Sequence, residues 1–167
     1  MVENQKKMKE ICIKLMEERG VSIDQIADIV YDLQIKYVKT LTMEHCKYAI
    51  GRVLDKREVQ NAIITGLELD ILAEKKLLSE PLQTLVFEDN PLYGIDEILV
   101  LSITNVYGSI GLTNFGYVDK VKPGIIGELD EIGKNTDKCH TFMDDIIGAI
   151  AAAAASSIAH NAVGDKE

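Results

Sequence analysis

The sequence has 167 residues, 47% of them hydrophobic, and a formal net charge of −9 at pH 7. This length favours one domain with a substantial core. The acidity argues against a nucleic-acid partner, because phosphate backbones repel carboxylates. The acid is concentrated in residues 61–167, which carry 17 acidic and 7 basic side chains. A solvated acidic surface and a bound divalent cation would each explain that excess.

The sequence predicts a cytoplasmic protein without a transmembrane span. The amino-terminal stretch alternates charged and apolar residues in a helical rhythm and lacks the apolar core of an export signal. Polar residues interrupt the apolar stretch 95–118, and the stretch 146–158 is too short to cross a bilayer. The chain has three cysteines, and their spacing fits buried thiols in a reducing compartment; they are Cys12, Cys46 and Cys139.

Amphipathic helices are predicted throughout residues 1–80. Ser22 and Gln25 have the spacing of a capping box, Thr42 can cap another helix, and Pro81 suits the first turn of a fifth. The helical repeat of apolar residues predicts helices over 2–19, 22–37, 42–54 and 57–78. A DNA-binding helix-turn-helix within 22–54 is the rival interpretation. The net charge of +1 over residues 1–60, without a basic stripe, argues against it.

Two apolar helices are predicted in residues 81–167, and each begins with a pair of acids. Asp96 and Glu97 precede an apolar segment that reaches residue 106, and we expect this segment to be a buried helix. Asp144 and Asp145 precede a stretch rich in Gly and Ala, which other helices can approach closely. The sequence therefore predicts a single all-α domain, a compact orthogonal helical bundle with one of these two helices at its centre.

The chain between these two helices is expected to be less regular. Glycines at 108, 111 and 116 predict a loosened segment, and a short helical turn is expected over 128–132. The acid pairs have a simple structural explanation, because carboxylates in a first helical turn accept free backbone N–H groups and complement the helix dipole. Two such pairs, with further acids between them, also fit a shared divalent cation. We therefore expect the two pairs to converge in space.

Three motifs follow one another in the second part of the chain. They are the pair Asp96-Glu97, the stretch FGYVDKVKPGIIGELD from Phe115 to Asp130, and the stretch DDIIGAI that begins at Asp144. In this order they resemble the phosphatidylglycerophosphatase A family, and the whole chain is similar to the soluble branch of that family. The resemblance covers roughly residue 93 to the end of the last apolar helix.

The resemblance implies a Mg²⁺-dependent phosphatase that removes the phosphomonoester of phosphatidylglycerophosphate, with Mn²⁺ as a substitute ion. The residues that it carries over are Asp96, Glu97, Asp144 and Asp145 as metal ligands and Asp119, Asp130 and Lys122 as catalytic residues, with Lys122 also binding substrate. Asp119 and Asp130 could each act as base, orienting group or nucleophile. His140 is a candidate acid for the leaving alcohol, and a polar loop residue is the simpler interpretation of it.

One departure from the family leaves the substrate open. The membrane enzymes of the family carry a loop of the type G-x-L-S-P-x-x-P-G-T, whereas residues 1–80 here are charged amphipathic helices. The substrate could be a phosphorylated glycerol lipid reached at a membrane surface, or a soluble phosphate ester. The alternative function is a non-catalytic regulatory or oligomerising helical protein with an acidic cation site. A homo-oligomer fits either function.

Overall fold

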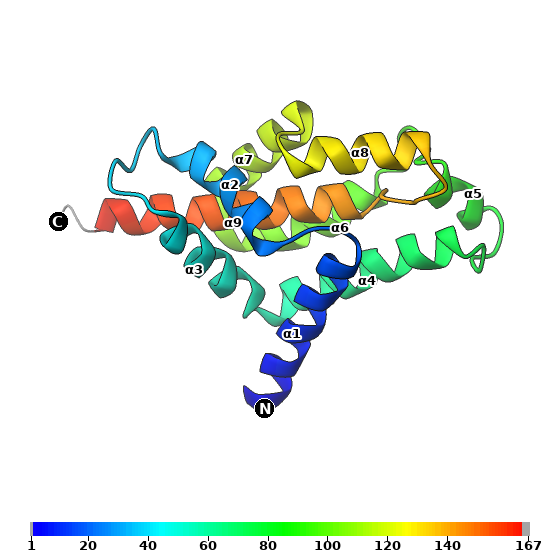
Figure 1. Ribbon diagram of the computed structural model, residues 1–167, viewed down its shortest axis with the longest axis horizontal. Coiled ribbons are helices and arrows are strands. Elements are labelled where there is room, and N and C mark those ends of the chain that lie inside the picture. The colour runs from blue at the N-terminus through cyan, green and yellow to red at the C-terminus, as the bar shows by residue number, and fades with distance from the viewer. Residues whose placement is uncertain (1, 165–167) are drawn as a thin grey trace.

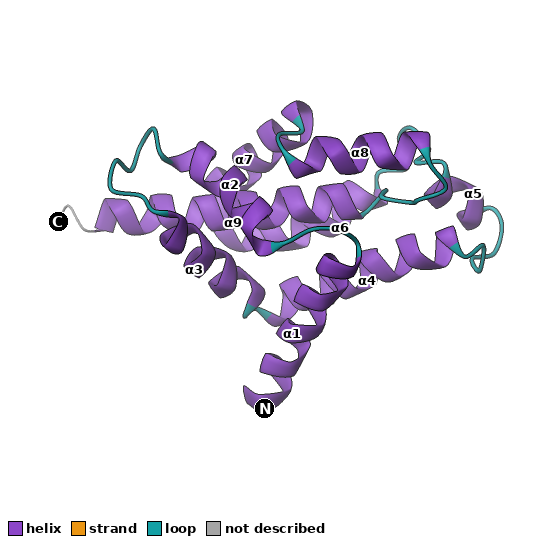
Figure 2. Ribbon diagram, viewed as in Figure 1, coloured by secondary structure: helices purple, strands orange, loops and turns teal. Residues whose placement is uncertain are grey.

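The computed structural model describes residues 2–164, and the side chains of residues 6–161. Among the described residues there are helices and no strands, as Figure 2 shows. The all-α prediction is therefore confirmed. In chain order the helices are α1 (Val2–Glu18), α2 (Ile23–Gln34), α3 (Met43–Leu54), α4 (Arg57–Glu74), α5 (Leu82–Phe87), α6 (Ile95–Thr104), the 3₁₀ turn η1 (Asn105–Tyr107), α7 (Gly108–Val121), α8 (Ile125–Asn135) and α9 (Met143–Gly164).

Helix α9 lies at the centre of the bundle. In Figure 1 it runs along the long axis of the molecule, and α2, α3, α4, α6, α7 and α8 all contact it. Every residue from 141 to 156 is buried. Its small side chains permit close packing: Gly148 is so placed that a Cβ atom there would lie 3.3 Å from Val118. The prediction of a central helix after Asp144 is confirmed.

The first four helices form as the apolar spacing and the caps predict. Ser22 and Gln25 make both hydrogen bonds of the capping box, and the Thr42 side chain accepts the N–H of residue 45. Two predicted ends are wrong: α2 stops at Gln34 instead of residue 37, and α4 stops at Glu74 instead of residue 78. Each helix ends in a tight turn that the apolar pattern does not reveal. The three cysteines are free and buried, as predicted.

Helix α6 is not the buried helix that its composition predicts. Its buried residues are Val100, Ile103 and Thr104, and the Ile98 side chain is 63% exposed. The helix packs mainly against α4 and α9. Since α6 is apolar on nearly all sides, its sequence does not show which face meets the core.

The segment between α6 and α9 is more regular than predicted. Residues 108–121 form helix α7 in spite of their glycines, and α8 is a full helix where the sequence predicts a turn over 128–132. Phe115 and Val118 of α7 are buried, and α7 contacts α9. This burial offsets the low helix propensity of glycine.

Among the described residues, one segment has the length and composition of a membrane span. It is Ile95–Val121, with a mean hydropathy of 1.3 and 28% of its most apolar window buried. The structure breaks this segment at η1 and at Gly108, whose φ is +67°. A single segment of this kind is a weak indication of a span.

Candidate functional site

The amino-terminal ends of α6 and α9, which carry the two acid pairs, line one pocket. The loop of residues 89–94, the first turn of α6, the last turn of α7 and the first turn of α9 enclose about 330 Å³. Six of the seven residues singled out in the sequence line this acidic pocket, namely Asp96, Glu97, Asp119, Lys122, Asp144 and Asp145. The expected convergence of the two acid pairs is confirmed. The seventh residue, Asp130, lies outside the lining and reaches the pocket through Lys122.

The first turn of α9 is held by a carboxylate from α4. Asp70 is fully buried and accepts the backbone N–H groups of Phe142 and Met143, the latter at 3.0 Å. The free N–H groups at the start of this long apolar helix are thereby satisfied inside the protein. Asp144 and Asp145 follow directly, so Asp70 sets where these two carboxylates stand. The sequence spacing does not identify Asp70, because this residue lies inside helix α4, 72 residues before Phe142.

Lys122 is positioned by the turn between α7 and α8. It adopts the left-handed conformation, with φ +46°, and its N–H donates to the carbonyl of Val118 at 2.7 Å. Pro123 then prevents the helix from continuing. Gly127 allows α8 to begin close by, because a Cβ atom at residue 127 would lie 2.7 Å from the carbonyl oxygen of Lys122. The turn therefore directs the Lys122 side chain back across the end of α7.

The ammonium group of Lys122 lies among three carboxylates. Its Nζ is 2.7 Å from Oδ2 of Asp144, 3.5 Å from Oδ1 of Asp130 and 3.8 Å from Oδ1 of Asp119. Burial works against the charge on Lys122, but these carboxylates outweigh that effect and raise its pKa. Lys122 is therefore charged at every physiological pH.

The two carboxylates at the head of α9 differ in their surroundings. Burial raises the pKa of Asp144, and the neighbouring Lys122 limits that rise. Burial also raises the pKa of Asp145, and here the carboxylates of Asp144, Asp119 and Asp96 add to the increase. Asp145 is therefore the carboxyl group that most lacks a compensating positive charge.

Two further acids complete this electrostatic environment. The Oδ1 atom of Asp96 is buried and has no hydrogen-bond partner. Asp89, which the sequence did not single out, lines the pocket with a φ of +46°. Burial of its carboxyl group, followed by the charge of Asp96, raises the pKa of Asp89. The feature that draws attention to Asp89 is its left-handed backbone conformation, which is rare for a residue other than glycine. This feature can be read from the backbone and not from the sequence.

The donor set of the pocket fits a hard divalent cation. All the acidic groups are oxygen donors, and the buried Oδ1 of Asp96 has no hydrogen-bond partner. Among the described residues, no three His, Cys, Asp or Glu side chains already surround one point as metal ligands. Lys122 and Lys134 supply the positive charge of the lining instead. Binding of an ion would require the carboxylates to rotate toward it.

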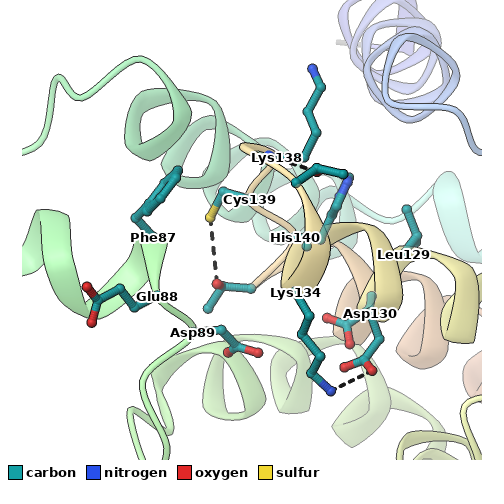
Figure 3. A pocket seen from close by; sticks show the side chains of 13 residues that line it. Phe87, Glu88, Asp89, Leu129, Asp130, Lys134, Lys138, Cys139 and His140 are labelled. Carbon is teal, nitrogen blue, oxygen red and sulfur yellow. Dashed lines mark hydrogen bonds and ion pairs between the residues drawn. The ribbon is translucent and has the colours of Figure 1, made fainter.

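A second cavity, of about 360 Å³, adjoins the acidic pocket. The two share Asp89, Lys134, Thr141 and Asp144 in their linings. In Figure 3, Asp89 lies on one side of this cavity, and Lys134 and Asp130 lie together on another. Lys134 donates to Asp130 at 2.6 Å, and Lys138, the other lysine of the lining, lies 3.6 Å from Glu74. The arrangement leaves space for a ligand to extend beyond the acidic pocket.

His140 lines the second cavity and is absent from the lining of the acidic pocket. Its side chain is 7% exposed, and Nδ1 is buried without a partner. Burial, followed by the charge of Arg19, lowers the pKa of His140 to about 4. The imidazole is therefore neutral at pH 7. His140 lies in the loop between α8 and α9, as the simpler interpretation predicts, but it is buried in the wall of a cavity.

Comparison with known proteins identifies relatives over most of the chain. A family model described as Phosphatidylglycerophosphatase A matches residues 14–160. The uncharacterized protein YutG of Bacillus subtilis is 59% identical over 147 residues, which cover 88% of this chain and 87% of YutG. The uncharacterized protein MJ1330 of Methanocaldococcus jannaschii is 36% identical over 117 residues, which cover 69% of this chain and 84% of that protein.

Solved structures share the fold. The low temperature requirement C protein from Listeria monocytogenes superimposes with a TM-score of 0.89 at 54% identity, covering 93% of this chain and 96% of that one. The protein ypjQ from Bacillus subtilis superimposes with a TM-score of 0.90 at 56% identity, covering 98% of this chain and 99% of that one. The central position of α9 is therefore a shared architecture.

Proposed function

The chain belongs to the phosphatidylglycerophosphatase A family, and we propose that it is a Mg²⁺-dependent phosphatase acting on a phosphomonoester. The observation that supports this proposal most is the charge arrangement around Lys122. A lysine whose Nζ is 2.7 Å from Asp144 lies in a pocket that also contains Asp96 and Asp145. A pocket that combines a fixed cation with crowded carboxylates suits a phosphate bound together with a metal ion.

The metal would be held by four of the pocket carboxylates. We assign this role to Asp96, Glu97, Asp144 and Asp145, which line the pocket from α6 and α9. A divalent cation bound there would neutralise phosphate oxygens and lower the pKa of a water molecule. Without such a cation, the carboxylates would repel a phosphomonoester dianion.

Lys122 and the two remaining acids would have separate roles. Lys122 would bind a phosphate oxygen as a point charge. Asp119 lines the pocket, and we assign it as the base that takes a proton from the attacking water. Asp130 is engaged by Lys134 at 2.6 Å and lies 3.5 Å from Lys122, so it would position the lysine. Water adds to phosphorus while Asp119 takes one of its protons, the bond from phosphorus to the alcohol oxygen breaks, and that proton is delivered through solvent to the alcohol oxygen, so that inorganic phosphate and the alcohol leave.

The test is phosphate release by the purified protein. With Mg²⁺ or Mn²⁺ it should release inorganic phosphate from phosphatidylglycerophosphate or from a water-soluble glycerophosphate, and a chelator should abolish the release. Asp145→Asn should reduce the rate strongly, because it removes a ligand charge with little change in volume. Asp137→Asn, at an exposed position away from the pocket, is the matched control.

The two substrates distinguish the forms of the proposal. Release from the lipid alone would favour a substrate reached at a membrane surface, whereas release from the soluble ester would favour a cytoplasmic substrate. If neither is hydrolysed faster by the natural protein than by Asp145→Asn, the enzyme proposal is wrong. The acidic pocket would then be a structural or regulatory ion site.

A further inference from the structure

The wall of the second cavity contains a buried imidazole that has no hydrogen-bond partner. The buried residues of this wall that carry a polar side-chain atom are Cys139, His140, Thr141 and Asp144. The Cys139 thiol and the Thr141 hydroxyl both donate to the carbonyl oxygen of Val86, and Asp144 accepts a hydrogen bond from Lys122. Among the described residues, no hydrogen bond to a ring nitrogen of His140 is found.

An unpaired imidazole in a cavity wall points to a group that the cavity receives. In its neutral form an imidazole has one nitrogen that donates a hydrogen bond and one that accepts. Buried polar groups nearly always have a partner, because an unsatisfied donor or acceptor raises the free energy of the folded protein. His140, which Figure 3 draws among the side chains of the wall, is therefore completed by a molecule in the cavity.

The rest of the wall indicates which kind of group pairs with His140. The lining has four acids and two lysines, and both lysines already face carboxylates, which disfavours a second anionic group. A hydrocarbon would fit against Phe87 and Leu129 but would leave the imidazole unpaired. A hydroxyl group both donates and accepts, so it can pair with either ring nitrogen. The wall therefore suits a short carbon chain that carries hydroxyl groups.

The second cavity adjoins the pocket in which the phosphate would lie. Its volume of about 360 Å³ falls within the usual range for ligand sites, about 300–1,000 Å³. The carbonyl of His140 accepts the N–H of Asp144 at 3.4 Å, and Asp144 lines both spaces. The start of α9 thus links the imidazole to a carboxylate of the acidic pocket.

We propose that the second cavity binds the alcohol part of the substrate and that a hydroxyl group of this alcohol hydrogen-bonds to the imidazole of His140. His140 is then a specificity-determining residue, which selects phosphomonoesters of glycerol-like alcohols over those of plain alkyl alcohols. A site that pairs with a substrate hydroxyl rejects an analogue without it, since the polar group of the site then stays unpaired. The inference rests on the proposed phosphatase function, because it places the phosphate of the same molecule in the acidic pocket.

Phosphonates test the proposal without hydrolysis, because their phosphorus–carbon bond is not cleaved. The first probe is dihydroxybutylphosphonate with its hydroxyls on the two carbons farthest from phosphorus, and the second is butylphosphonate. With Mg²⁺ present, the full chain should bind the first probe about tenfold more tightly than the second in calorimetric titration. His140→Phe, which keeps a ring without nitrogen atoms, should bind both with similar affinity. His160→Phe, at an exposed residue of α9 outside both linings, is the matched control and should still discriminate.

A second measurement needs no substitution in the cavity. Isotope-edited NMR of the imidazole nitrogens reports on the three histidines of the chain. His45→Gln and His160→Gln, both at exposed residues, identify the remaining signals as those of His140. The dihydroxy probe should shift the ring signals of His140 more than butylphosphonate does, and it should leave those of the other two histidines in place.

A third phosphonate distinguishes a lipid headgroup from a free polyol phosphate. It is the dihydroxy probe with a methyl group on its terminal hydroxyl, which blocks that oxygen as a phospholipid linkage does. Binding as tight as that of the dihydroxy probe fits a lipid headgroup. Weaker binding that still depends on His140 fits a free polyol phosphate.

Three results would overturn the proposal. The first is equal or undetectable binding of the dihydroxy probe and butylphosphonate by the natural protein. The second is discrimination that persists in His140→Phe, and the third is a set of His140 ring signals that the dihydroxy probe does not move. In a protein that releases phosphate, any of these results would refute this inference and leave the proposed function intact. Discrimination through His140 in a protein that releases no phosphate would refute the catalytic proposal alone.

Discussion

The carboxylate of Asp70 on α4 receives the backbone N–H of Phe142 with both of its oxygens, at 3.1 and 3.2 Å, across 72 residues of sequence. This contact fixes the first turn of α9 against α4. The adjacent Cys139 thiol donates to the same carboxylate at 3.5 Å. The head of the central helix, which carries two residues of the acidic pocket, is thus positioned by a group that does not line the pocket.

Asp70→Asn should lower both stability and activity. The substitution keeps the volume but places an amide donor against backbone N–H groups, which leaves buried donors unpaired. We expect a loss of roughly 1–3 kcal/mol in the free energy of unfolding, measured by urea denaturation. Asp28→Asn, at an exposed residue of α2, makes the same chemical change and should be nearly neutral. Equal effects of the two substitutions would contradict a positioning role for Asp70.

Lys122→Met should destabilise the protein and make its stability depend more on a divalent cation. Removal of the ammonium group leaves Asp144 without its ion pair at 2.7 Å, at an expected cost of roughly 1–3 kcal/mol once partial exposure is allowed for. Added Mg²⁺ should restore more stability to Lys122→Met than to the natural protein. Lys120→Met, at an exposed residue in the last turn of α7, is the control. Thermal denaturation with and without Mg²⁺ measures the difference, and identical responses would contradict the assignment.

A divalent cation should raise the melting temperature of the natural protein. A ligand that binds only the folded state at a hundred times its dissociation constant stabilises that state by about 2.7 kcal/mol. Mg²⁺ or Mn²⁺ should therefore raise the midpoint of thermal unfolding, and chelation should reverse the increase. Asp145→Asn should lose this response, while Asp137→Asn should keep it. A response that survives in Asp145→Asn would place the ion elsewhere.

His140 should make the protein less stable as the pH falls from about 6.5 to about 4. Burial lowers its folded-state pKa to about 4, so in this range the unfolded chain takes up a proton that the folded protein does not. The corresponding loss approaches about 3 kcal/mol at the acid end. His140→Gln should flatten the dependence, as seen in urea unfolding at pH 7 and pH 4.5. Parallel curves for the two proteins would show that His140 keeps its ordinary pKa in the fold.

Gly127→Ala should disturb the turn that holds Lys122. The added Cβ would lie 2.7 Å from the Lys122 carbonyl oxygen, and both atoms belong to the backbone or are fixed to it. We expect a loss of roughly 1–3 kcal/mol and reduced phosphate release. Gly133→Ala, in the same helix, meets its nearest neighbour at 3.6 Å and should stabilise the helix by up to about 1 kcal/mol. Similar changes in both variants would contradict a special role for the turn.

The sequence predicts the composition of the acidic pocket better than its surroundings. Asp96 and Asp144 were identifiable because each opens an apolar helix, where an acidic residue requires an explanation. Asp70 and Asp89 were not identifiable. Asp70 lies within an ordinary helix and acts on a turn that is distant in sequence, and Asp89 lies in a short loop whose course depends on tertiary packing. Such residues are recognised only from the three-dimensional arrangement.

The prediction that helix α6 is buried is wrong for a physical reason. Composition reports how apolar a segment is, but not how much core surface remains to cover it. The Ala-rich helix α9 occupies the centre, and Ile98 of α6 consequently remains exposed. The glycines of residues 108–121 predict an irregular segment, and this prediction is also wrong. The segment forms helix α7, because packing against α9 outweighs the low helix propensity of glycine.

The central position of α9 also has a consequence for synthesis of the chain. Helix α9 follows α1 to α8 in sequence, yet it supplies the surface that α2, α3, α7 and α8 cover. On the ribosome those earlier helices emerge before their common partner exists, so their apolar faces stay available to chaperones until residues 143–164 have left the exit tunnel. A nascent chain interrupted before residue 143 would lack the helix against which six others pack, which makes it a substrate for proteolytic quality control.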